Sequence, residues 1–200
     1  MLYVSFGLIA TSLAPLASLV IIDLGMTHAE MGLAMGAWQF IYIFSAVPSG
    51  ILLDKIGARH ALAIAGIIVS LSALARVFAD DATSLILAVM LFGLGGPVVS
   101  AGASKVVISS FTGSSRGLAM GIYMTGPAIG SIISLTTTHS VLLPLFDNSW
   151  RTIFLLWAGV AFLSAFSWFF LATVARSSAT GRQTGPYISQ TRVIADLIAR

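Results

Sequence analysis

Cysteine is absent from the 200 residues of this sequence. Its absence excludes disulfides, iron–sulfur clusters and metal sites built on thiolates. Histidine occurs three times at scattered positions, and acidic residues stay outside the long apolar runs. A metal centre or a nucleophile–base pair therefore lacks its parts, so we expect neither an enzyme nor a bound cofactor.

Charge is also scarce. Asp, Glu, Lys and Arg make up 8% of the chain, against roughly 25% in typical soluble domains. Hydrophobic residues reach 58%, and the mean hydropathy is +1.00. This composition excludes an ordinary soluble globular domain and indicates a membrane protein.

Long apolar runs carry the fold prediction. The runs 1–22, 31–53, 82–104, 117–146 and 152–175 contain no charged residue, and 61–79 contains only Arg76. A hydrocarbon core about 30 Å thick needs roughly 20 helical residues, and each run comes close to this length or exceeds it. The runs are continuously apolar and do not alternate, which favours helices over a transmembrane β-barrel.

The sequence therefore predicts an all-α membrane protein with six transmembrane helices in residues 1–175. We expect these helices at about 2–22, 30–52, 61–79, 83–110, 117–143 and 152–175. Thr27 or His28 begins the second helix, with Glu30 in its first turn. The fifth run is too long for one crossing, so its helix tilts or ends near "TTTHS". Residues 176–200 are polar and basic, and we interpret them as a cytoplasmic linker.

The basic residues are sorted along the chain in a way that predicts topology. With Lys105 set aside, the links 2–3 and 4–5 and the tail carry Lys55, Arg59, Arg116, Arg176, Arg182, Arg192 and Arg200. The other links are flanked by acidic residues and have Arg76 and Arg151 as their only basic ones. An excess of basic residues marks cytoplasmic loops, so both termini are expected in the cytoplasm, at an inner or plasma membrane. This sorting accounts for the net charge of +3 without a nucleic-acid partner.

The link "SGILLDKIGARHAL", residues 49–62, places Asp54, Lys55 and Arg59, with His60 beside them, in a short stretch between two apolar helices. Lys55 and Arg59 suit a cytoplasmic link, whereas Asp54 works against the positive-inside bias. Its carboxylate could pair with a basic side chain or with the N-terminus of a facing helix. Gly50 allows close helix contact, and Gly57 permits the left-handed backbone of a tight turn.

This link resembles the signature of the major facilitator superfamily, G-x-L-x-D-R/K-x-G-R/K-R/K. The matching residues are Gly50, Leu52, Asp54, Lys55, Gly57 and Arg59, and Ala58 departs from the pattern. The resemblance implies the amino-terminal half of a twelve-helix transporter, built as 3+3 inverted repeats. It also implies that the link acts as a conformational latch against the other half, with Asp54 in that role.

Further motifs resemble the same family. "TGPAIGS", with Gly126, Pro127 and Gly130, is similar to the helix-five G-P-x-x-G-G motif of antiporters, but Ser131 replaces the last glycine, so antiport does not follow. The family frequently has an arginine near the middle of helix four. This sequence lacks it, and Val89 and Met90 occupy that region. The phrase "GLGGP…SKVV…RGLAMGIYMTGP" resembles the cyanate- and nitrate-porter-like branches.

Glycines spaced four residues apart predict close helix contacts. The pairs are Gly32 with Gly36, Gly117 with Gly121, and Gly126 with Gly130.

Polar residues near the middle of the predicted helices are candidates for a substrate cavity, with packing or interhelical hydrogen bonding as the alternative. The candidates are Gln39, Tyr42, Ser100, Lys105, Tyr123 and Thr125, with Thr11, Ser12 and Trp38 in similar positions. Lys105 is either an anchor that extends to the membrane surface or an anion contact facing the cavity. Arg76 is expected to pair with Asp80 at i+4 or to anchor the helix end. His139, near the end of the fifth predicted helix, is a candidate for relaying protons.

The function predicted from the sequence is transport of a small anionic or organic solute by alternating access. The expected partners are the substrate, the lipid bilayer, and either a missing carboxy-terminal six-helix half or a second copy. Coupling to a proton or another ion stays open. A six-helix scaffold without transport activity and a membrane-embedded enzyme are the alternatives.

Overall fold

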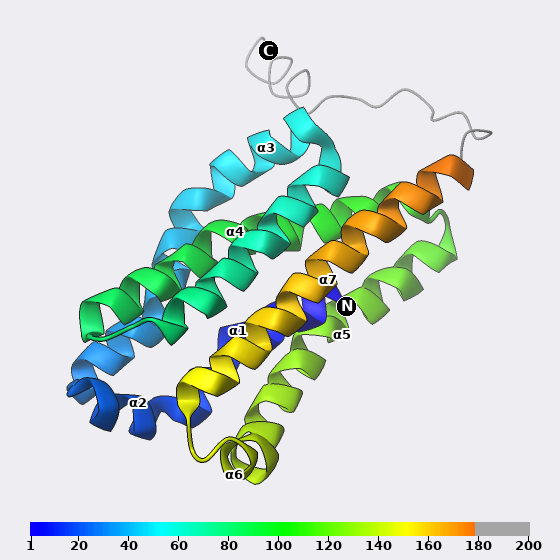
Figure 1. The fold of residues 1–200 in the computed structure, drawn as a ribbon. Helices are drawn as coiled ribbons and strands as arrows, with labels where there is room; N and C mark the ends of the chain where they lie inside the picture. The colour runs from blue at the N-terminus through cyan, green and yellow to red at the C-terminus, as the bar shows by residue number, and fades with distance from the viewer. Residues whose placement is uncertain (179–200) are drawn as a thin grey trace. The chain divides into compact units, whose positions relative to one another are not determined.

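The computed structural model describes the backbone of residues 1–178, and every described element is helical. Of the predicted linker, 176–200, the first three residues belong to the last helix, and 179–200 lie outside the described residues. The chain divides into two units at residue 170, and the contacts below lie within residues 1–170. The elements in Figure 1 are α1 (Leu2–Thr11), a 3-10 turn (Ala14–Leu16), α2 (Ala17–Leu24), α3 (His28–Val77), α4 (Ala82–Ser110), α5 (Ser114–Thr137), a π-helical turn (Thr138–Leu142), α6 (Leu143–Leu145) and α7 (Trp150–Ser178).

The first predicted helix is broken in the middle. Helix α1 ends at Thr11, and regular helix resumes at Ala17 after the 3-10 turn. Pro15 lies in this turn, and its ring nitrogen has no hydrogen to donate to the preceding turn. The break therefore leaves backbone carbonyls that other groups must satisfy.

Helix α3 contains the second and third predicted helices. It has 50 residues, and Gly57 interrupts it with φ 79° and ψ 154°, outside the helical region. Side chains from both sides of Gly57, including Ser45 and Ala65, line one cavity, so the two legs of α3 lie side by side. Figure 1 shows the second leg folded back along the first. Among the described residues, five helices are long and apolar enough to cross a membrane, so the count of six crossings stays a prediction.

The helices begin and end where local chemistry favours it. Thr27, one of the two starts that the sequence predicts, is the N-cap of α3 and forms a capping box with Glu30. Asp81 and Ser84 form a second one at the start of α4. Hydrogen bonds from Ser84 hold the pKa of the Asp81 carboxyl below its ordinary value. Helix α5 ends at Thr137, within the predicted "TTTHS" region.

Helix α1 lies inside the bundle and contacts α4, α5 and α7. The ring of Phe6 stacks on Phe92 of α4 with centroids 4.8 Å apart, and Ser5 Oγ donates to Ser164 Oγ of α7 at 2.7 Å. The side chain of Ile9 is fully buried. The carbonyl of this residue therefore lies in the interior of the bundle, beside the break.

Glycines let α1 and α5 approach backbone to backbone. A Cβ atom on Gly130 would collide with the Val4 carbonyl oxygen, and one on Gly7 would collide with the Pro127 carbonyl oxygen. The Gly-Pro motif of α5 is therefore the contact surface for α1. The other predicted pairs, Gly32 with Gly36 and Gly117 with Gly121, face open space in this chain.

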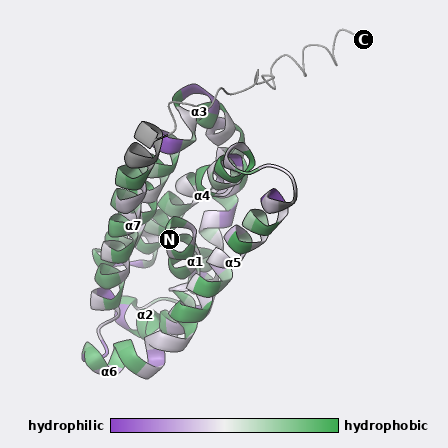
Figure 2. Cartoon of the chain, turned by 90° about the vertical axis from the view of Figure 1, so that its right-hand side faces the viewer, coloured by the Kyte–Doolittle hydropathy of each residue, from purple (hydrophilic) through white to green (hydrophobic). Residues whose placement is uncertain are grey.

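Helix α5 leaves most of its apolar surface uncovered. In its most apolar stretch 17% of the residues are buried, against 61% in α4. Leu118, Ile122 and Ile132 are among its exposed side chains. Figure 2 shows hydrophobic residues along most of the length of the helices, and many of them are exposed, the inverse of a soluble bundle. Lipid or further protein must cover such surfaces.

We expect Gly130→Ala to lower the unfolding temperature of the protein in detergent, because its methyl group would collide with the backbone of α1. Overpacking of this kind costs roughly 1–3 kcal/mol. The matched control is Gly159→Ala, since a Cβ atom there has no neighbour within 4 Å. Thermal unfolding followed by tryptophan fluorescence measures both variants. Equal unfolding temperatures for Gly130→Ala and the wild type would contradict the close contact.

Candidate functional site

A cavity of about 390 Å³ lies between the broken first helix and the two legs of α3. Its polar lining comes from Thr11 at the end of α1, from Trp38 and Gln39 on the first leg of α3, and from Arg76 on the second leg. Val89 of α4 completes one wall. An apolar cavity with a few polar groups is the usual form of a small-molecule site.

Arg76 is the dominant charge of this cavity. The residue is 2% exposed although its guanidinium carries a full positive charge. One terminal nitrogen, Nη1, donates to the Ile9 carbonyl and to Ser12 Oγ, each at 3.3 Å, and Nη2 donates to Ser72 Oγ at 3.5 Å. Nε has no partner within the described part of the chain. All of these acceptors are neutral.

Aromatic rings stabilise the charge where carboxylates do not. The guanidinium carbon of Arg76 lies 5.4 Å from the ring centroid of Phe154 and 5.9 Å from that of Phe92. Trp38 meets Phe92 edge to face at 5.4 Å, which links these rings to the cavity wall. Among residues 1–170, no Asp or Glu forms an ion pair with Arg76. Cation–π contacts attract the cation but leave its charge unneutralised.

The predicted pairing of Arg76 with Asp80 is wrong, and so is its placement as an interfacial anchor. Helix α3 ends at Val77, so Asp80 does not lie one turn further along the same helix. The Asp80 carboxylate instead lies 3.6 Å from Arg151, whose Nη1 also lies 2.6 Å from Asp23 Oδ2. Arg151 thus holds the ends of α2, α3 and α7 together, and Arg76 faces the interior.

The predicted latch residue Asp54 forms an ion pair with Lys105 of α4. The Lys105 ammonium lies 2.6 Å from Asp54 Oδ1, and the two side chains are 32% and 61% exposed. Neither interpretation of Lys105 from the sequence included this partner, which lies 51 residues away. The pair connects the turn of α3 to the end of α4, outside the cavity of Arg76.

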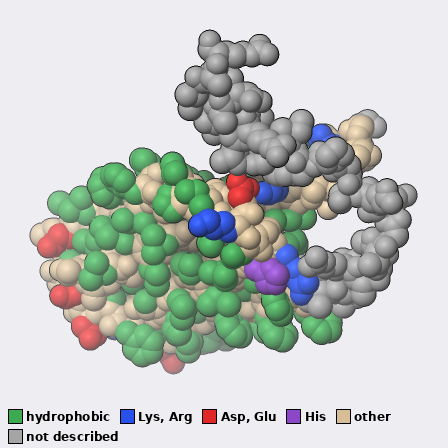
Figure 3. Space-filling view, turned by 90° about the horizontal axis from the view of Figure 1, so that it is seen from above, with side chains coloured by type: hydrophobic (Ala, Val, Ile, Leu, Met, Phe, Trp, Pro, Cys, Tyr) green, Lys and Arg blue, Asp and Glu red, His purple; other side chains and the backbone are tan. Residues whose placement is uncertain are grey.

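The other residues of the signature surround this turn. Gly57 has the positive φ that the sequence predicts for a tight turn, and Lys55 is exposed. The close helix contact expected at Gly50 is wrong for the described residues, because nothing lies within 4 Å of a Cβ atom built there. Leu52 packs against the core. The carbonyl of Arg59 accepts a hydrogen bond from Trp168 Nε1 at 3.3 Å, and its guanidinium lies 5.1 Å from the ring of Phe169. Figure 3 shows charged side chains toward the two ends of a largely apolar surface.

Of the predicted cavity residues, Gln39 lines the cavity of Arg76. Tyr42 contacts Trp38 edge to face, Tyr123 donates to the Ser100 carbonyl at 2.9 Å, and exposed Thr125 bonds within its own helix. These four residues lie outside the lining of this cavity, so their contact with a substrate stays a prediction. His139 is exposed in the π-helical turn, and its proposed relay is likewise a prediction.

Arg76 is the functional candidate that the sequence reasoning missed. The signal was present, because a single arginine inside an apolar run is costly and often functional. Because Arg76 lies near the end of its apolar run, the sequence favours an anchor of the helix end. Only the packing of α1 against α3 reveals that the side chain faces inward.

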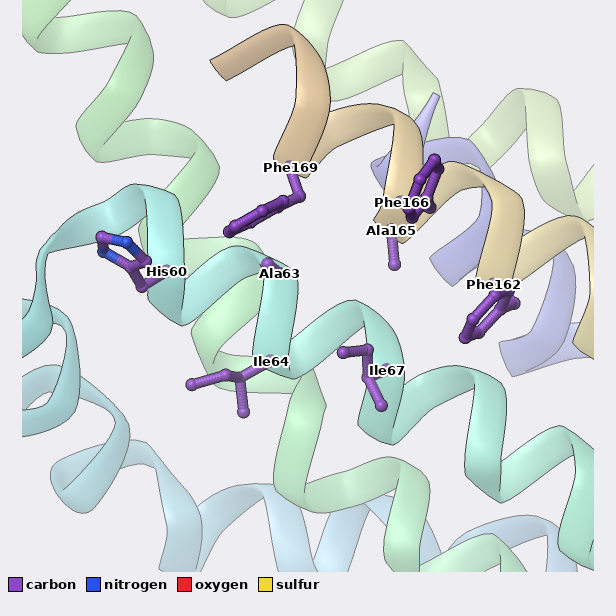
Figure 4. A pocket seen from close by; sticks show the side chains of 8 residues that line it. All are labelled: His60, Ala63, Ile64, Ile67, Phe162, Ala165, Phe166 and Phe169. Atoms are coloured by element: carbon purple, nitrogen blue, oxygen red, sulfur yellow. The ribbon is translucent and has the colours of Figure 1, made fainter. Parts of the chain in front are cut away.

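A second hollow, of about 300 Å³, lies between the second leg of α3 and α7 (Figure 4). Its lining is apolar except for His60, with Phe162, Phe166 and Phe169 on the α7 side. A polar solute would find almost no hydrogen-bonding group there. The cavity of Arg76 is therefore the better candidate for a substrate site.

Comparison with known families identifies the class of the protein. The Major Facilitator Superfamily profile matches residues 1–196. The chain belongs to this superfamily, as its charged link and apolar helices indicate. The structure adds that Arg76 from α3 shares a cavity wall with Val89, one of the residues in place of the frequent helix-four arginine.

Curated relatives include transporters of sugar acids and anions. The chain is 28% identical over 148 residues to a D-galactonate transporter of Escherichia coli, covering 74% of this chain and 34% of that protein. It is 27% identical to a hexuronate transporter of Bacillus subtilis, with the same coverage. A probable chloroplastic anion transporter 3 of Arabidopsis thaliana is 28% identical, over 66% of this chain and 26% of that protein. The chain thus spans about a third of the length of these relatives.

A solved structure supports the fold. A bacterial homologue of the human lysosomal transporter Spinster, in an inward-facing and unoccupied conformation, superposes with a TM-score of 0.73 at 18% identity. The match covers 84% of this chain and 40% of that chain. The fold is therefore half of a major-facilitator bundle. The resemblance to cyanate and nitrate porters stays a prediction.

The Asp54–Lys105 pair predicts a rescue experiment. Asp54→Lys places a second ammonium group beside that of Lys105. The repulsion should lower both the unfolding temperature and the transport rate. The additional change Lys105→Asp restores opposite charges and should recover most of both losses. Exposed pairs contribute about 0.2–1 kcal/mol, so the effect on stability should be small. A double variant no better than Asp54→Lys alone would show that the contact is unimportant.

Proposed function

We propose that this chain forms the amino-terminal half of a secondary transporter that moves a small organic anion by alternating access. The observation that carries the proposal is Arg76, a buried cation at a cavity wall whose hydrogen-bond acceptors are all neutral. A buried charge is costly until a counter-charge reaches it. A substrate carboxylate would supply that counter-charge.

The neighbours of Arg76 suit a hydroxylated anion. Thr11 and Gln39 offer hydroxyl and amide groups on the same cavity lining, and Trp38 offers a flat ring face. Sugar acids combine a carboxylate with several hydroxyls. The names of the relatives, D-galactonate and hexuronate transporters, support this substrate class.

Alternating access requires a second six-helix unit. Support comes from the exposed apolar side of α5 and from relatives about three times as long as the matched segment. Either a carboxy-terminal half or a second copy of this chain would cover that side. Asp54 and its partner Lys105 lie at the turn assigned to the latch. We place this turn and both termini in the cytoplasm, because most basic residues lie on that side.

The coupling species would act outside the Arg76 cavity. Its lining includes no carboxylate from the described residues. Proton coupling would therefore use His139, a residue of the other half, or the charge of the substrate itself. No cofactor is needed for this mechanism, and antiport does not follow from the Gly-Pro motif, whose glycines have a packing role.

Uptake into proteoliposomes tests the proposal. The full-length transporter should accumulate radiolabelled D-galactonate or D-glucuronate, and the neutral polyol galactitol should not compete. Imposing a pH gradient then shows whether a proton is coupled. Equal transport of galactitol would contradict the anion class. Failure to move either acid, with protein folded by tryptophan fluorescence, would favour the scaffold alternative.

A further inference from the structure

The hydrogen bonds of Arg76 connect the cavity to the break in the first helix. The Ile9 carbonyl accepts from the Ser12 amide at 3.3 Å, from Ser12 Oγ at 2.8 Å and from Arg76 Nη1 at 3.3 Å. Ser12 Oγ also accepts from Arg76. One guanidinium thus binds both residues that lie at the end of α1, just before the 3-10 turn.

We propose that a substrate carboxylate binds Arg76 and replaces its bonds to Ile9 and Ser12, so that binding releases the broken segment of the first helix. The proposal rests on the proposed function above, since it assumes an anionic substrate in this cavity. It adds a step that links substrate binding to a change in the protein.

The present bonds of Arg76 are weak enough to be exchanged. Their lengths of 3.3 to 3.5 Å exceed the range of good N–H···O bonds, and Nε is unpaired among the described residues. A carboxylate accepts two parallel bonds from a guanidinium at about 2.7–2.9 Å, roughly twice as strong as bonds between neutral groups. The anion therefore competes well against a carbonyl and a hydroxyl.

Ile9 and Ser12 keep a local arrangement after release. The Ser12 hydroxyl still donates to the Ile9 carbonyl, so the carbonyl oxygen keeps a donor and the hydroxyl keeps an acceptor. What is lost is the link between the break and the second leg of α3. Since α1 touches α5 backbone to backbone through Gly7 and Gly130, movement at the break reaches α5, the helix with the largest uncovered side.

Binding measurements on two variants test the exchange. The probe is whichever of D-galactonate and D-glucuronate the wild type transports, with affinity followed by tryptophan fluorescence or by calorimetry. Arg76→Lys keeps the charge but loses the bidentate geometry and should weaken binding about tenfold. Ser12→Ala removes a competing acceptor and should strengthen binding. Arg116→Gln, at the exposed α4–α5 turn, is the control and should leave affinity unchanged.

A reporter in the break provides a measurement that leaves Arg76 in place. The chain has no cysteine, so Ala14→Cys introduces a single thiol at the exposed first residue of the 3-10 turn. Saturating probe should change the rate of maleimide labelling at this thiol. In the Arg76→Lys variant the same occupancy should change the rate less.

The outcomes separate this proposal from the proposed function. If the wild type transports the acid but Arg76→Lys binds it equally well, the role of Arg76 is overturned and transport stands. Weaker binding by Ser12→Ala, or a labelling rate unaffected by saturating probe, overturns the exchange. If the wild type transports neither acid, the proposed function fails and this proposal fails with it.

Discussion

The arrangement of the inner helices depends on the burial of one positive charge. Arg76 lies at 2% exposure in a chain that is 8% charged, and residues from several helices surround it: Ile9 and Ser12 at the end of α1, Ser72 on its own helix, Phe92 on α4 and Phe154 on α7. Each of these groups is neutral. Neutral surroundings suit a site in which a substrate anion binds beside the guanidinium. A permanent carboxylate partner would neutralise the positive charge that attracts the anion.

Two other constraints hold the surrounding helices in place. At one end, Arg151 contacts Asp23 and Asp80 and donates to the carbonyls of Val77 and Ala79. At the other end, Asp54 and Lys105 join the turn at Gly57 to α4. The ionic contacts therefore lie at the ends of the helices, where water weakens them, and the interior relies on close packing such as that of Gly130 against Val4. The proposed transport by alternating access needs such a division, because contacts at the helix ends must break and form again during the cycle.

Local features of the structure could be predicted from the sequence, and long-range ones could not. The apolar runs, the capping box at Thr27, the turn at Gly57 and the end of α5 near Thr137 all depend on neighbouring residues. The pairing of Asp54 with Lys105 spans 51 residues, and the contact of Gly7 with Pro127 joins two helices that lie far apart in the sequence. The side of α3 on which Arg76 lies is set by packing against α1, and an apolar run does not specify which side faces inward. The sequence therefore predicts the cavity site only in part. It gives Gln39, Trp38 and Thr11 as cavity candidates, but it gives Arg76 as an ion-pair partner or an anchor of the helix end.

The central claim is that the cavity beside Arg76 recognises an organic anion through this guanidinium. An experimental structure of the full-length transporter with a bound sugar acid tests it most directly. The claim predicts a carboxylate oxygen at about 2.7–3.0 Å from a guanidinium nitrogen of Arg76, with the bonds to Ile9 and Ser12 broken. A sugar acid bound elsewhere, with Arg76 still hydrogen-bonded to Ile9 and Ser12, would contradict it.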